Sequence, residues 1–242
     1  MARGALLRPT GRMTGMDLDL ESRVVLVAGG RGCIGSAVVQ RLRAEGARVV
    51  VASRNPGPGG VVLDLQDQDS IDAAVRGVLD EHGRIDGLVV SAAPSARTLD
   101  PARNSDPVQI AQAVDAKALG FLRLAGAVVP AMQAAGFGRV VGISGQNAYL
   151  TGNTTGAVRN AALIIAAKNL ADELAGSGVT VNTVNPGPVT DHPSVDVPRG
   201  GPGESSPEQI AAVVTFLVSP VAAAVSGEAV AVGHRVRGVL AL

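Results

Sequence analysis

Short apolar runs rich in valine recur along this chain of 242 residues, and segments with helical periodicity separate them. Each run is apolar on both faces, as expected for strands of a parallel sheet covered on both sides. The runs begin at Arg23, Ala47, Gly87, Gly138, Val179 and Glu228. The helical patterns span residues 34–45, 70–82, 108–135, 156–175 and 207–218. This alternation predicts an α/β fold with a doubly wound parallel sheet of about seven strands and helices on both faces.

The alternation continues to the end of the chain, so we expect a single domain over residues 21–242. Residues 1–20 are expected to form a flexible tail, because their first 16 residues carry three arginines and no acid and lack the apolar core of a secretory signal. The Pro/Gly-rich segment 192–207 is too long for a tight connection. We expect it to be a mobile loop on the substrate side.

Charge and composition exclude several classes of function. The chain has 21 basic and 21 acidic side chains, so it offers no net field to nucleic acid or to anionic lipid. Its apolar stretches are too short to span a membrane, so a soluble, cytoplasmic protein is expected. Cys33 is the only cysteine, which excludes an internal disulfide and fits a reducing compartment. We expect no metal site.

A glycine cluster follows the first predicted strand. Gly30, Gly32 and Gly35 fit the pattern G-x-G-x-x-G, which allows a tight turn and a close approach of the backbone to a pyrophosphate. Free amides at the start of the next helix then face the phosphates. An ordinary glycine turn is the alternative, but the position between a strand and a helix favours a dinucleotide site.

The end of the second predicted strand indicates which dinucleotide is bound. Ser53 and Arg54 stand where an NAD site usually has an acid for the ribose diol, and Arg31 lies within the glycine loop. Two guanidinium groups near one ribose suit a 2′-phosphate, so NADP(H) is the expected cofactor. The alternative is that both arginines are solvated surface residues.

Longer segments resemble the short-chain dehydrogenase/reductase family over residues 22–233. GRIDGLVVSAAPS resembles the segment leading to the family's Asn-Asn-Ala-Gly, and GRVVGISG resembles the strand that ends at its catalytic serine. AALIIAAKNLADELAGSGVTVNTVNPGPV is similar to the family's catalytic helix, sixth strand and Pro-Gly turn. SPEQIAAVVTFLVSPVAAAVSGEAVAV resembles the family's closing helix and strand. The resemblance implies a Rossmann fold, oxidoreductase activity on a small organic substrate, and a homodimer or homotetramer.

The resemblance also implies a set of cofactor-binding residues. Around the phosphates and the adenine these are Gly29, Arg31, Gly32, Ile34, Gly35, Arg54, Asp64, Leu65, Ala92 and Ala93. Against the nicotinamide they are Pro186, Gly187 and Val189, with Thr190 as a partner of the carboxamide.

The catalytic positions depart from the family. The family's helix begins Tyr-x-x-x-Lys, and the aligned positions here hold Gly156 and Asn160, neither of which can protonate a carbonyl oxygen. An asparagine of the family falls at Lys117. The serine corresponds to Ser144 or is lost at Gly145, because the register of the loop is open by one residue.

Substitute proton donors are few, since the chain has one tyrosine and two lysines. Tyr149 lies on the loop that borders the substrate in the family, and Lys117 extends from the fourth helix; with Ser144 they are the catalytic candidates. The alternatives are a partly buried aromatic residue for Tyr149 and a solvated helix residue for Lys117. His192 and Asp191, after the Pro-Gly turn, are read as loop surface more readily than as a proton shuttle.

Two kinds of function remain open. One is an atypical NADP(H)-dependent oxidoreductase that acts on a small polyfunctional substrate in a biosynthetic pathway and takes protons from a non-standard donor. The other is a non-catalytic subunit that supports an active paralogue in a hetero-oligomer. A non-redox enzyme that uses the same pocket is a further alternative to the first.

Overall fold

The structure, a computed structural model, describes residues 16–93 and 98–238. Its described part forms a seven-stranded sheet in the order β3-β2-β1-β4-β5-β6-β7, and all neighbouring strands are parallel. The strands are β1 (Val24–Ala28), β2 (Arg48–Ser53), β3 (Val61–Val62), β4 (Gly87–Val90), β5 (Gly138–Ile143), β6 (Val179–Pro186) and β7 (Ala229–Val232). The predicted α/β fold is therefore confirmed, and β3 is a short strand that no apolar run indicated.

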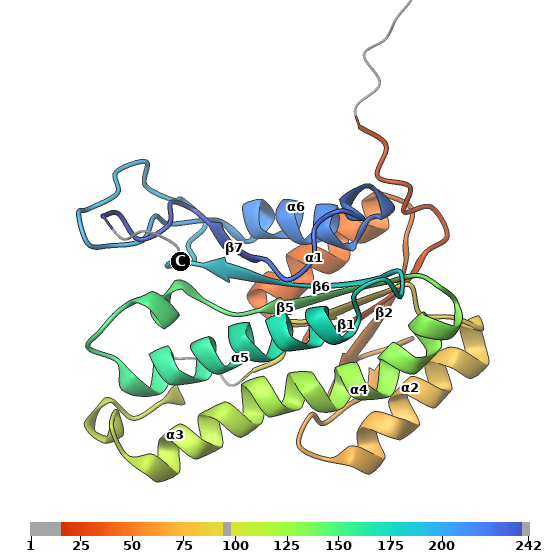
Figure 1. Cartoon of the computed structure of the whole chain (residues 1–242), viewed down its shortest axis with the longest axis horizontal. Helices are drawn as coiled ribbons and strands as arrows, with labels where there is room; N and C mark the ends of the chain where they lie inside the picture. Colours follow the sequence, from red (N-terminus) through yellow and green to blue (C-terminus); the bar gives the residue numbers. More distant parts are fainter. Residues whose placement is uncertain (1–15, 94–97, 239–242) are drawn as a thin grey trace, which may run out of the picture.

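Helices cover both faces of the sheet (Figure 1). The α-helices are α1 (Cys33–Ala44), α2 (Gln68–His82), α3 (Pro107–Val114), α4 (Gly120–Ala134), α5 (Thr154–Glu173) and α6 (Pro207–Val218). The short helices are η2 (Pro101–Arg103), η4 (Gln146–Tyr149), η5 (Pro220–Ala222) and the π-helical turn η3 (Asp115–Leu119). The predicted helix 108–135 is thus α3 and α4, joined through the π turn.

The two faces of the sheet build two separate cores. In β1, Val25 and Val27 pack with α1 and α6, whereas Val24 and Leu26 pack on the other face, where α2, α4 and α5 lie. Side chains alternate across a strand, so a strand that is buried on both faces must be apolar at every position. This is the physical reason for the unbroken valine runs.

The start of the domain lies earlier than expected. Leu18 and Leu20 are buried and pack in the core with α1 and α6. The predicted end of the tail at residue 20 is therefore wrong. Burial of the two leucine side chains away from water stabilises their packing in the core. Residues 1–15 lie outside the described residues.

The long loop before α6 contacts the C-terminal segment. The amide of Gly203 donates to the carbonyl oxygen of His234 at 2.8 Å, and Arg237 Nη1 donates to that of Val197 at 3.0 Å. Val189 and Ser205 form an isolated parallel bridge at the base of the loop. These contacts join residues 192–207 to the end of the chain, and the expected mobility stays a prediction. No helix in the described residues is long and apolar enough to cross a membrane.

Candidate active site

A cavity of about 420 Å³ opens at the carboxyl ends of β1, β2 and β4. Six of the residues expected at the cofactor line it: Gly29, Arg54, Asp64, Leu65, Ala92 and Ala93. The structure thus brings together residues from four separate parts of the sequence. The cavity is also lined by residues that were not predicted as cofactor contacts: Ala52, Ser53, Leu63, Gln66, Thr98 and Ala116. The signal for some of these was available, because they follow or end strands at the same edge of the sheet.

The glycine loop has room for backbone only. Gly29 has φ +82°, and a Cβ atom there would lie 2.6 Å from the amide nitrogen of Ala92. A Cβ atom at Gly35 would lie 2.1 Å from the carbonyl oxygen of Gly29. Gly32 is the N-cap residue of α1 and has no side chain to cap the helix, while Ile34 in the first turn packs against the α1/α6 core. The amides of this turn therefore remain open to an anionic ligand.

The two predicted arginines flank the end of β2. Arg31 Nη1 donates to the carbonyl oxygen of Asn55 at 2.9 Å, which places its guanidinium at the turn that Arg54 begins. Both arginines are exposed. Arg54 lines the cavity, and Arg31 contacts the turn that follows it, so two positive charges lie at the end of β2.

The residues expected at the nicotinamide lie at the end of β6 and just after it, and they do not line this cavity. Pro186 is the last residue of β6, and a Cβ atom at Gly187 would lie 2.2 Å from the carbonyl oxygen of Gly203. Val189 pairs with Ser205. The amide of Thr190 donates to the carbonyl oxygen of Ser205 at 3.1 Å. The loop before α6 thus holds these residues at the end of β6.

The start of α5 carries Gly156 and Asn160, the positions that the resemblance aligned with a Tyr and a Lys. The single tyrosine of the chain, Tyr149, is followed four residues later by Asn153, so the chain contains no Tyr-x-x-x-Lys. Asn153 is the N-cap residue of α5 and accepts a hydrogen bond from the amide of Gly156 at 2.8 Å. The side chain of Asn160 lies against Gly145, where a Cβ atom would be 3.0 Å from Asn160 Nδ2.

Ser144 is buried and turned into the protein. Its hydroxyl donates to the backbone carbonyl oxygen of Asn160 at 2.9 Å. Its own carbonyl oxygen accepts a hydrogen bond from Lys117 Nζ at 3.2 Å. Ser144 therefore connects the end of β5 to α5 and to η3.

Lys117 lies in the π turn η3 and is buried. Single π turns of this kind often occur at functional sites. Burial and, secondly, the charge of Arg159 lower the pKa of the Lys117 ammonium to about 7. A lysine with such a pKa is present near neutral pH both as the ammonium, which gives a proton, and as the amine, which takes one.

Tyr149 lies at the end of η4, near the carboxyl end of β6. Its hydroxyl accepts a hydrogen bond from Asn185 Nδ2 at 3.3 Å, and Arg235 stands 5.5 Å from the centre of its ring. Among the described residues no hydrogen bond joins Tyr149 to Lys117. Asp191 and His192 are exposed.

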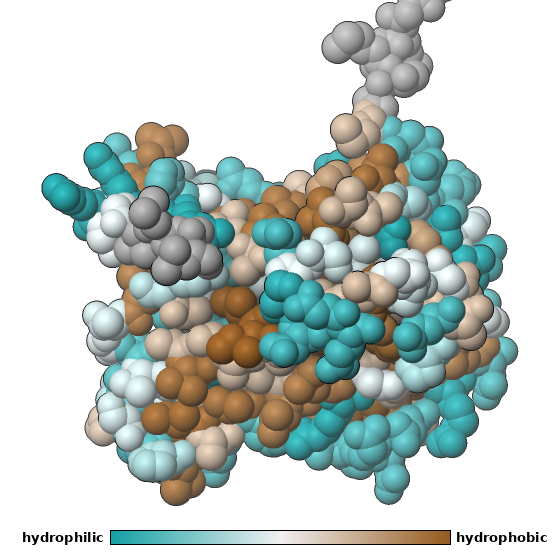
Figure 2. All heavy atoms as spheres, viewed as in Figure 1, coloured by the Kyte–Doolittle hydropathy of each residue, from teal (hydrophilic) through white to brown (hydrophobic). Residues whose placement is uncertain are grey.

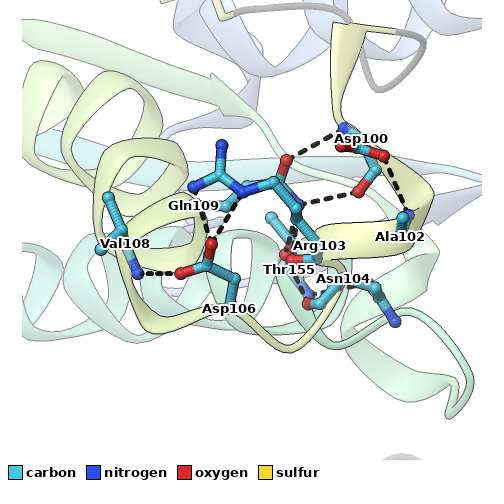
Figure 3. Close-up of polar contacts among 8 residues, drawn as sticks. All are labelled: Asp100, Ala102, Arg103, Asn104, Asp106, Val108, Gln109 and Thr155. Atoms are coloured by element: carbon cyan, nitrogen blue, oxygen red, sulfur yellow. Dashed lines mark hydrogen bonds and ion pairs between the residues drawn. The ribbon is translucent and has the colours of Figure 1, made fainter.

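A polar network holds the segment before α3 against the start of α5 (Figure 3). Gln109 Nε2 donates to the carbonyl oxygens of Asp100 and Arg103 at 3.1 and 2.9 Å. Thr155 Oγ1 donates to the carbonyl oxygen of Asn104 at 2.6 Å. The network therefore positions the turn of α5 that carries Gly156. Sequence reasoning missed Gln109, because a polar residue at a buried helical position has no periodic signal.

Arg159 was also missed as a site residue. It is buried on α5, where desolvation lowers its pKa, and its charge acts on Lys117. The only signal was one arginine in a strongly apolar helical segment. Within the described residues, no three His, Cys, Asp or Glu side chains gather as metal ligands would.

Known proteins share both the sequence pattern and the fold. The family model described as enoyl-(acyl carrier protein) reductase matches residues 28–234. The 3-oxoacyl-[acyl-carrier-protein] reductase MabA of Mycobacterium tuberculosis is 33% identical over 227 residues, with 87% of this chain and 91% of that protein covered. The 3-oxoacyl-[acyl-carrier-protein] reductase FabG of Vibrio cholerae is 30% identical over 237 residues, with 87% and 96% covered. The crystal structure of gox2181 matches with a TM-score of 0.77 and 26% sequence identity. The match covers 89% of this chain and 96% of the gox2181 chain.

Proposed function

Because the chain belongs to the short-chain dehydrogenase/reductase family of oxidoreductases, we propose that it is a cytoplasmic, NADP(H)-dependent reductase of a small organic carbonyl compound. In this proposal Lys117 supplies the proton. The relatives MabA and FabG are named as 3-oxoacyl-[acyl-carrier-protein] reductases, and they favour a carbonyl substrate in a biosynthetic pathway.

The shape of the glycine loop supports the cofactor. At Gly29 and Gly35 only hydrogen atoms fit, and the open N-terminus of α1 offers amides to phosphate oxygens. Arg31 and Arg54 would hold the 2′-phosphate at the edge of the cavity. When bound, NADPH supplies the hydride that reduces the carbonyl carbon.

The observation that carries the proposed mechanism is the buried ammonium of Lys117 at the carboxyl end of β5. The carbonyl oxygen of Ser144 accepts a hydrogen bond from Lys117 Nζ and so orients it. Lys117 then gives a proton to the carbonyl oxygen of the substrate, which becomes the hydroxyl of an alcohol. A positioned acid of this kind contributes about 10²- to 10⁴-fold to the rate.

The other two candidates have different parts in this proposal. The hydroxyl of Ser144 donates to the carbonyl oxygen of Asn160, so we give it no part in proton transfer to the substrate. The carbonyl oxygen of Ser144 instead positions Lys117. Tyr149 is the second possible donor, and its contact with Asn185 places it at the end of β6. We assign the proton to Lys117, because its pKa is about 7.

A second candidate function is a non-catalytic subunit, which the absence of Tyr-x-x-x-Lys favours. Exposed apolar side chains on the layer of helices that includes α4 and α5 favour assembly in either case (Figure 2). Leu122 on α4 and Val158 and Ile165 on α5 are exposed. We propose that these helices pair across a two-fold axis in a homodimer or homotetramer, or with a paralogue.

The test separates binding of NADPH from turnover. We expect tight NADPH binding in a calorimetric titration, and NADPH oxidation with members of a panel of ketones, enones and quinones. Lys117→Met should lower kcat by tenfold or more and leave NADPH affinity unchanged, while Tyr149→Phe serves as the matched variant. Full turnover in Lys117→Met contradicts the assignment of the donor. A protein that binds no NADPH and co-purifies with an active paralogue is the supporting subunit.

A further inference from the structure

A second cavity lies at the amino ends of β5 and β6. It has a volume of about 560 Å³ and is bordered by the turns before these two strands and by the segment after η5. The strands are parallel and the cofactor cavity opens at carboxyl ends, so the second cavity lies at the opposite edge of the sheet. The two cavities share no lining residue.

Two buried polar side chains line this second cavity. Arg139 on β5 is 3% exposed, and Thr180 on β6 is 6% exposed. They are partners in the register of the two strands, so their side chains point to the same face of the sheet. Val141, two residues along β5, packs on that face in the core with α1 and α6.

The guanidinium of Arg139 has no carboxylate partner. Its Nε donates to the carbonyl oxygen of Ser219 at 3.3 Å, and its Nη1 donates to those of Gly138 and Gly178 at 2.8 and 3.0 Å. None of the ion pairs within residues 16–93 and 98–238 includes Arg139. A guanidinium has five N–H donors, so the two on Nη2 have no acceptor in this part of the chain.

The buried carboxylate at this edge of the sheet is already paired. Asp86 forms ion pairs with Arg23, at 3.1 Å, and with Arg84. The ring of Phe137 lies between the guanidinium groups of Arg23 and Arg139, each 4.3 Å from its centre. Three arginines therefore share this edge with one buried carboxylate of the described chain. A buried cation costs free energy unless an anion joins it, so Arg139 is suited to bind one.

A hydroxyl group without a partner lines the same cavity. Thr180 Oγ1 has no hydrogen-bond partner among the residues that the structure describes. Buried polar atoms are normally satisfied, and a threonine hydroxyl donates readily to an anionic oxygen. The cavity thus offers a cation and a hydroxyl donor from neighbouring strands.

The rest of the lining favours a small ligand with one negative charge. Phe137, Ala171 and Ala223 provide apolar surface, which suits a short hydrocarbon chain. Asp172 also lines the cavity, where it pairs with Lys168. Its carboxylate disfavours a ligand with two negative charges, such as phosphate.

We propose that this cavity binds a short-chain monocarboxylate, whose oxygen atoms accept hydrogen bonds from Arg139 Nη2 and Thr180 Oγ1. The hydrocarbon chain of the ligand lies against the apolar lining. A planar carboxylate matches the planar guanidinium, and such charge-assisted bonds are stronger than neutral ones. The site is separate from the cofactor cavity, so the proposal does not depend on the proposed function.

The three phenylalanines of the chain allow a direct test. Protein labelled with fluorophenylalanine gives three ¹⁹F signals, and Phe137→Leu assigns the one at the cavity. Butyrate is the probe, butyramide is its neutral counterpart, and inorganic phosphate at pH 8 is the dianion. We expect butyrate to shift the Phe137 signal until it saturates. The signals of Phe121 and Phe216, which do not line the cavity, should stay unchanged.

Thr180→Val removes the hydroxyl and keeps the size of the side chain, so it should weaken butyrate binding by about threefold or more. Thr183→Val is the matched control, because Thr183 Oγ1 on β6 is also buried without a partner but does not line the cavity. Arg139→Met should abolish the shift of Phe137. If that variant does not fold, the two threonine variants and the contrast between butyrate and butyramide still decide.

An unmoved Phe137 signal, an equal shift with butyramide, or equally strong binding of phosphate overturns the proposal. Equal shifts of all three signals show a general salt effect and also overturn it. Butyrate binding that survives Arg139→Met, or that Thr180→Val and Thr183→Val change equally, contradicts the assigned contacts.

Discussion

Replacing Lys117 by methionine should change how the stability of the protein depends on pH. Methionine has a similar length and no charge, so it keeps most of the packing and removes the buried ammonium. Burial, helped by Arg159, lowers the pKa of Lys117 from 10.5 to about 7 in the folded chain. At about 1.4 kcal/mol for each pH unit, the folded protein loses on the order of 5 kcal/mol by holding this ammonium at acidic pH.

The sign follows from proton binding. Between pH 7 and 10.5 the unfolded chain holds the proton of Lys117 and the folded chain has released it. The free energy of unfolding therefore rises with pH in this window and is independent of Lys117 at lower pH, where both states are protonated. For the wild-type protein this contribution amounts to roughly 2.5 kcal/mol between pH 6 and pH 9.

Urea denaturation at constant ionic strength, followed by circular dichroism at several pH values, measures this contribution. At pH 6 the free energy of unfolding should be higher for Lys117→Met than for the wild-type protein. This difference should shrink or reverse gradually as the pH rises from 6 to 9. Lys168→Met is the matched control, because Lys168 is exposed and its removal should leave the pH dependence of the wild type. Parallel curves for wild type and Lys117→Met would refute the assigned burial of the charge.

Three further variants test the cofactor site and the assembly, and a fourth, Gly77→Ala, is a control for glycine replacement in a helix. Arg54→Ala should weaken NADPH binding by about tenfold or more and leave NADH binding nearly unchanged, because only NADPH has the 2′-phosphate; equal losses in calorimetry contradict this. Gly35→Ala should abolish NADPH binding, since its Cβ would lie 2.1 Å from a carbonyl oxygen. Gly77→Ala, where the space is open, should instead stabilise α2 by about 0.5–1 kcal/mol, and a Gly35→Ala protein that binds NADPH normally is the adverse result. Ile165→Arg should yield monomers in light scattering, and a wild-type monomer at micromolar concentration rules out the predicted interface.

The glycine loop and the strand ends were predictable because their constraints are local. Gly29 and Gly35 stand close together in the sequence, and the positions of Arg54 and Ala92 follow from where a parallel strand ends. A strand buried on both faces also has a recognisable apolar composition, as β1 shows. The same local patterns do not extend to Leu18 and Leu20, which precede the first strand and become buried only through packing on α1 and α6.

The surroundings of the catalytic candidates were predicted less completely, because their geometry depends on contacts between distant segments. Lys117 was a candidate for its rarity, but its burial results from a π turn that no periodicity indicates. Ser144 was a candidate for its position, and only the structure shows that its hydroxyl donates into α5. Arg159 attracted no role, because its effect on Lys117 crosses 42 residues of sequence.

The amino-acid sequence by itself determined the alternation of strands and helices, the glycine turn and the absence of a Tyr-x-x-x-Lys motif, because each of these depends on neighbouring residues. Tertiary structure decided which side chains share the site. Packing of α5 against η3 brings Arg159 and Lys117 into one desolvated space, and there the low polarity of the interior converts an ordinary ammonium into one with a pKa of about 7.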